Sequence, residues 1–96
     1  MSVVYQYIFS QAIPLGDIEA TLLRTLISAE YLHGPTRVRL EAGHYLDAQD
    51  KTCVVDATTP VGQDLNKLLV GALATQFGPD SFTVERIAKA PAMAHG

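Results

Sequence analysis

Hydrophobic side chains recur with two different periods along this chain, and these periods constrain the fold more than any other feature. In four short segments they recur at about every second residue, which is typical of a half-buried β-strand. In two longer segments they recur at every third or fourth residue, which is typical of an amphipathic α-helix. The predicted strands are 3–9, 36–42, 51–57 and 81–87, and the predicted helices are 15–32 and 60–77.

Glycine and proline mark the ends of both predicted helices. Gly34-Pro35 follows the first helix and Gly78-Pro79 follows the second, which is typical of a helix C-terminus. Thr59 precedes Pro60 at the start of the second helix, and these residue types favour the N-cap and first helical positions. In the first helix we expect Ile18, Leu22, Leu23, Leu26 and Ile27 to form the buried stripe.

The resulting order βαββαβ predicts an α+β fold of the ferredoxin-like type. We expect a four-stranded antiparallel sheet with two helices on one face and the first and third strands at its centre. The length of 96 residues suits one domain, which we assign to residues 1–88, with a flexible C-terminal tail at 89–96. Gly43 favours a β-bulge, and beyond it we expect residues 44–46 to prolong the second strand.

The charged residues on the strands indicate which face of the sheet is open to solvent. The residues expected beneath the helices are Val38, Leu40, Cys53, Val55, Phe82 and Val84. The first strand permits two assignments, because Tyr5, Tyr7 and Phe9 alternate with Val4, Gln6 and Ile8. We favour the tyrosines on the open face, where their hydroxyls reach water or a partner. The predicted contact surface comprises Tyr5, Tyr7, Arg37, Arg39, Val54 and Glu85.

The junction between the third strand and the second helix offers a second candidate site. Thr58, Thr59 and Gly62 lie where free backbone N–H groups at a helix start can hold an anion. Asp56 opposes an anion by charge repulsion, and a well-capped helix start explains the same residues. The anion site is therefore the alternative hypothesis, with His44 or Tyr45 as a neighbouring acid or base.

The remaining reactive side chains predict no metal site and no cofactor. Cys53 is the lone cysteine, so an internal disulfide is impossible, and its strand position favours a buried thiol. Glu41, His44 and Asp47 would converge on a metal only if a bulge at Gly43 realigned them.

Composition points to protein contacts rather than to nucleic acid. The net charge is −3, and no basic run is present. Hydrophobic residues make up 48% of the chain and charged residues only 18%, below the roughly 25% typical of soluble domains.

We therefore predict a non-enzymatic interaction module that acts through the open sheet face or an edge strand. We expect it to be homodimeric and cytoplasmic, with no membrane span. A protein with a basic surface suits it as a partner. The alternative is a small-molecule or anion sensor, or a small enzyme, with a pocket at the strand–helix junction.

Overall fold

The computed structural model describes residues 3–87 and 94–95 and has an α+β fold built on an antiparallel sheet. Four strands of five or six residues lie in the order β4-β1-β3-β2, and the two-residue strand β5 is added beside β2. The strands are β1 (Val4–Phe9), β2 (Gly43–Asp47), β3 (Thr52–Asp56), β4 (Phe82–Ile87) and β5 (Ala94–His95). The helices are α1 (Leu15–His33), α2 (Pro35–Glu41) and α3 (Pro60–Phe77), followed by the short 3-10 helix η1 (Pro79–Ser81).

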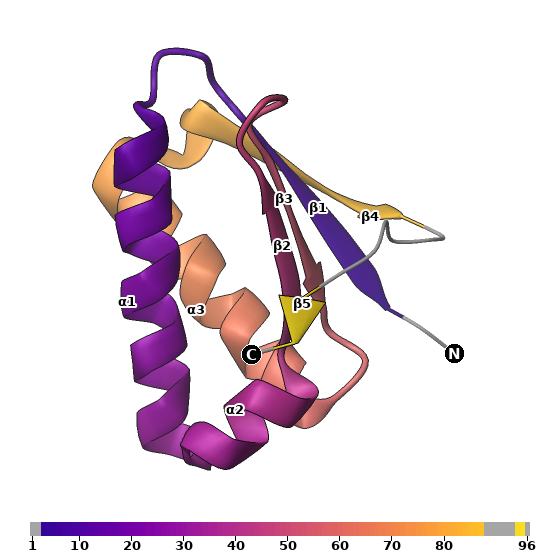
Figure 1. Ribbon diagram of the computed structural model, residues 1–96. Helices are drawn as coiled ribbons and strands as arrows, with labels where there is room; N and C mark the ends of the chain where they lie inside the picture. The colour runs from indigo at the N-terminus through magenta and orange to yellow at the C-terminus, as the bar shows by residue number, and fades with distance from the viewer. Residues whose placement is uncertain (1–2, 88–93, 96) are drawn as a thin grey trace.

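Helices α1, α2 and α3 lie on one side of the sheet, and no described residue forms a helix on the other side (Figure 1). Strands β1 and β3 occupy the inner positions, as the sequence predicts. Helices α1 and α3 form the layer over the sheet, and α2 joins the end of α1 to β2 (Figure 1). Within the described residues, no helix has the length and apolar character needed to cross a membrane.

The prediction of a strand over 36–42 is wrong, because this segment forms helix α2. Gly34 adopts a φ of 85° and ends α1, while Pro35 stands at the first position of the next helix. Val38 on α2 and Ala42, which caps this helix, lie one turn apart and are both buried, but Leu40 points to solvent. The strand begins only at Gly43, so the residues expected to prolong it, 44–46, form most of β2.

The expected orientation of β1 is also wrong, because Tyr7 and Phe9 face the helices. Tyr7 is fully buried, and its ring lies 6.3 Å from that of Phe9 and 6.2 Å from that of Phe82. Its hydroxyl donates to the side-chain oxygen of Asn66 on α3, so the polar end of this large ring is satisfied inside the protein. Gln6 consequently faces the open side, opposite Val54 and Glu85.

Helix α1 buries only part of the expected stripe, because Ile18 and Leu22 are buried as predicted but Leu23 and Ile27 are not. Its buried residues are Ile18, Thr21, Leu22, Thr25 and Ala29. Leu26 is partly buried, but Leu23 and Ile27 are 59% and 43% exposed. The hydroxyl of Thr25 donates to the carbonyl oxygen of Thr21 at 2.7 Å, which removes the cost of burying it. Two threonines therefore lie inside while larger apolar residues face water.

The start of α3 lies very close to the end of β3. A Cβ atom built on Gly62 would stand 2.0 Å from the carbonyl oxygen of Asp56, a distance that no side chain can occupy. Gly62 is therefore required for this helix to pack so tightly on the strand. Gly71, in the same helix, is exposed and has no atom within 4 Å of a built Cβ.

These two glycines provide a matched test of the packing. Gly62→Ala should lower the free energy of unfolding by about 1–3 kcal/mol, because the backbone of β3 must move. Gly71→Ala should raise it by about 0.5–1 kcal/mol, because alanine favours the helix and meets nothing. Urea unfolding followed by circular dichroism measures both. Equal effects of the two substitutions would contradict the close approach at Gly62.

Candidate interaction surface

The structure separates the six residues of the predicted contact surface. Tyr5 and Tyr7 lie on the helix-facing side of β1, and Arg37 and Arg39 lie on α2 rather than on the sheet. On the open face, Glu85 is exposed on β4, but Val54 is only 3% exposed. The open face also presents Ile8 and Tyr45, each 40% exposed. Whether any of these residues contacts a partner stays a prediction.

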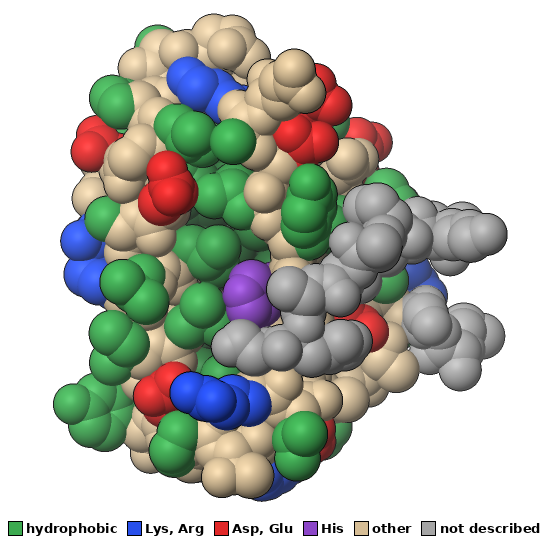
Figure 2. All heavy atoms as spheres, viewed as in Figure 1, with side chains coloured by type: hydrophobic (Ala, Val, Ile, Leu, Met, Phe, Trp, Pro, Cys, Tyr) green, Lys and Arg blue, Asp and Glu red, His purple; other side chains and the backbone are tan. Residues whose placement is uncertain are grey.

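A more exposed apolar surface lies on the outside of α1. We use the name outer α1 face for Gly16, Ala20, Leu23, Ile27 and Tyr31, which project away from the buried stripe of the helix. Tyr31 is 88% exposed, and Ile27 and Leu23 stand one and two turns before it. Figure 2 shows several hydrophobic side chains along this helix, with charged and other side chains between them.

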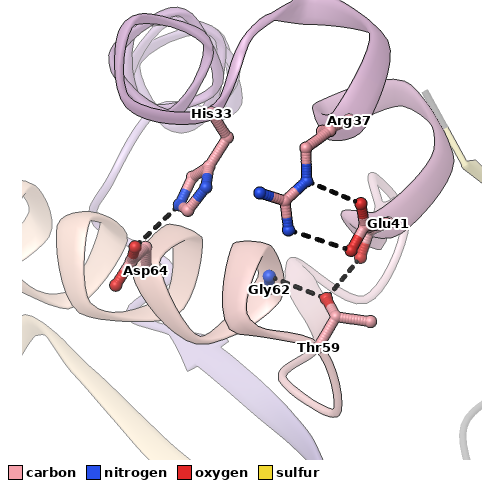
Figure 3. A network of polar contacts seen from close by, with 6 residues as sticks. All are labelled: His33, Arg37, Glu41, Thr59, Gly62 and Asp64. Atoms are coloured by element: carbon pink, nitrogen blue, oxygen red, sulfur yellow. Dashed lines mark hydrogen bonds and ion pairs between the residues drawn. The ribbon is translucent and has the colours of Figure 1, made fainter.

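Hydrogen bonds to α3 hold α1 in this rotation. Near its N-terminal half, the hydroxyl of Thr21 lies 2.8 Å from Oε1 of Gln76, and Arg24 donates to the same oxygen at 3.0 Å. At its last residue, Nε2 of His33 lies 2.7 Å from Oδ2 of Asp64 (Figure 3). Because these contacts lie at both ends of the helix pair, α1 cannot turn its exposed stripe inward without breaking them.

Helix α2 is fixed to the start of α3 by a single threonine. The hydroxyl of Thr59 accepts from the backbone N–H of Gly62 at 3.0 Å and donates to the carbonyl oxygen of Glu41 at 2.8 Å (Figure 3). On α2, Arg37 donates to the carboxylate of Glu41 at 2.9 Å, one helical turn away. This hydrogen bond holds the pKa of Glu41 below its ordinary value. Thr59 therefore caps α3 and anchors the last turn of α2 together.

The polar groups of the predicted anion site already form hydrogen bonds within the protein. The hydroxyl of Thr58 accepts from the backbone N–H of Val3 at 2.9 Å, and the Thr58 backbone N–H donates to Asp56 at 2.9 Å. Thr59 makes the two bonds described above, and Gly62 is buried. Anion binding at this junction is not tested by these contacts and stays a prediction.

The reactive side chains outside the helices are dispersed. His44 lies on β2, with Nδ1 2.9 Å from the carbonyl oxygen of Ala42, and Cys53 is buried in the core between the sheet and the helices. Burial raises the pKa of the Cys53 thiol to about 12. Within residues 3–87 and 94–95, no three His, Cys, Asp or Glu side chains are arranged to hold a metal ion.

Comparison with known proteins found no matching family model, no matching curated protein and no matching solved structure. The function must therefore be inferred from the surface of the molecule itself.

The double role of Thr59 leads to a prediction about stability. Thr59→Ala should lower the free energy of unfolding by about 1–2 kcal/mol, because the N-cap of α3 and the anchor of α2 are lost together. Thr59→Ser keeps the hydroxyl and should stay close to the wild-type value. Urea unfolding measures the difference, and an Ala variant as stable as the Ser variant would contradict this role.

The buried thiol and phenol predict a loss of stability in alkali. The pKa of Cys53 is raised to about 12, and burial likewise raises that of Tyr7. Groups whose folded pKa is raised contribute stability fully below their unfolded pKa, and that contribution declines as pH rises toward the folded value. Above its own ordinary pKa, which is 9.0 for the Cys53 thiol and 10.0 for the Tyr7 phenol, each group should subtract up to about 1.4 kcal/mol per pH unit.

Urea unfolding at a series of pH values from about 8 to about 11 measures this decline. Cys53→Ala should show a shallower fall than the wild type over the same range, whatever its stability at neutral pH. An identical slope in the two proteins would contradict the raised pKa of the thiol.

Proposed function

We propose that this protein is a non-enzymatic interaction module that binds another protein chain through the outer α1 face. The observation that carries this proposal is the rotation of α1, which buries Thr21 and Thr25 and leaves Leu23, Ile27 and Tyr31 in water. Large exposed apolar patches on small domains are typical of interaction sites. Covering one such side chain contributes about 1.5–3 kcal/mol, so three adjacent ones favour a stable contact.

The architecture is consistent with such a role. We interpret the strand order β4-β1-β3-β2, with α1 and α3 on one face, as the ferredoxin-like arrangement, to which α2 and β5 are additions. In this arrangement α1 is a long outer helix supported along its inner side by α3 and the sheet. A rigid helix with a fixed rotation presents the same side chains at all times, which lowers the entropy cost of binding.

The open sheet face, proposed from the sequence as the contact, is the weaker candidate. Its most exposed apolar residues, Ile8 and Tyr45, each have 40% of their surface in solvent, and Val4 and Val54 beside them are already buried. Less apolar surface therefore remains to be covered on the sheet than on α1.

Affinity purification of the tagged full-length chain from its source organism tests the proposal. Bound protein should be recovered with the wild type and with Tyr45→Glu, and should be lost with Leu23→Glu, whose side chain is solvent-exposed in the free protein. Circular dichroism confirms that each variant is folded. Loss of binding with Tyr45→Glu but not with Leu23→Glu would overturn the proposal in favour of the sheet face.

A further inference from the structure

We propose that the chain which covers the outer α1 face is a second copy of this protein, with the two α1 helices packed side by side and parallel. This inference rests on the proposed function and names its partner. It would give a dimer related by a two-fold axis along α1, in which the same surface of each copy is used.

The spacing of the apolar residues on the outer α1 face suits a pair of helices. Gly16, Ala20, Leu23 and Ile27 follow one another at intervals of four, three and four residues, which is the a/d spacing of a two-stranded coiled coil. In a parallel pair each of these residues meets its own copy. The small residues then meet near the N-terminus, where the helices approach closely, and Leu23 and Ile27 fill the wider layers.

We use the name seam for the line of contact between the two α1 helices. The charged residues beside the seam favour a parallel pair. Glu19 and Arg24 flank the seam on opposite sides and lie five residues apart, which is the spacing between g and e positions that pair across a parallel dimer. Glu19 of each copy would therefore face Arg24 of the other. An antiparallel pair would instead place Glu19 beside the flank of the other copy that also carries Glu19.

Both charges are available for this contact. The side-chain contacts of Arg24 are with the neutral groups of Thr21 and Gln76, at 3.3 and 3.0 Å, so its charge is not balanced by them. Among the described residues, Glu19 has no hydrogen bond or ion pair from its side chain, and it is exposed. In the dimer, Glu19 of each copy would thus lie beside the opposite charge of Arg24 on the other copy.

The mass of the full-length chain in solution, measured by sedimentation across a range of concentrations, tests the dimer. The wild type should reach twice the chain mass. Ile27→Glu should weaken the dimer by about tenfold or more, because a charge would be buried in the seam. Ile8→Glu is the matched control, since Ile8 has nearly the same exposure, 40% against 43%, but lies on the open sheet face. It should leave the dimer unchanged.

Single cysteines test the direction of the helices. A Cβ at Gly16 meets no atom within 4 Å, so Gly16→Cys fits the folded chain, and Ile27→Cys replaces an exposed side chain. Each variant alone should form a disulfide-linked dimer under mild oxidation, because each residue faces its own copy. An antiparallel pair could crosslink only one of the two. Cys53 is buried and provides the uncrosslinked wild-type control.

The outcomes separate this inference from the proposed function. A wild-type chain that stays monomeric at every concentration, yet still loses a bound protein when Leu23 is replaced by Glu, would overturn the second copy and leave the interaction module in place. A dimer weakened by Ile8→Glu but not by Ile27→Glu would overturn both. Crosslinking by Ile27→Cys alone would overturn the parallel direction.

Discussion

The packing of α1 on α3 is the constraint on which the surface of this protein depends. A helix with apolar residues on two sides can bury only one of them against a single layer. Here the contact of Thr21 with Gln76 and of His33 with Asp64 fixes which side is inside. Larger residues on the inner side would hold the helices farther apart. The apolar residues on the other side of α1 therefore remain exposed to solvent.

The segment between α1 and β2 fixes the position of α1 relative to the sheet. Gly34 ends α1 with a positive φ, and Pro35 begins α2 at once, so the chain turns without a flexible loop. Thr59 then ties the last turn of α2 to the start of α3, which itself packs against β3 through Gly62. The ends of all three helices therefore meet in one small region (Figure 3), and a change there would shift α1 relative to the sheet.

Most of the elements could be predicted from periodicity, but the rotation of single elements could not. Strands β1, β3 and β4, both long helices and the inner positions of β1 and β3 follow from the hydrophobic pattern and the glycine and proline signals. The segment 36–42 misleads because Val38, Leu40 and Ala42 alternate, although the spacing of Arg37 and Glu41 equally suits a helix. The sequence favours Tyr7 on the open face, because its partner Asn66 lies 59 residues away and cannot be identified from the local sequence. The outer α1 face has a signal in the local sequence, since Leu23, Ile27 and Tyr31 form a stripe of their own at intervals of four residues.

We propose that a second chain covers α1 and not the open side of the sheet. Methyl NMR spectra of isoleucine-labelled full-length protein, recorded as its concentration is raised, test this claim most directly, because Ile27 and Ile8 report on the two surfaces in one sample. The Ile27 methyl resonance should shift or broaden with concentration while that of Ile8 stays constant. A shift of the Ile8 resonance with an unchanged Ile27 resonance would show instead that the second chain covers the sheet.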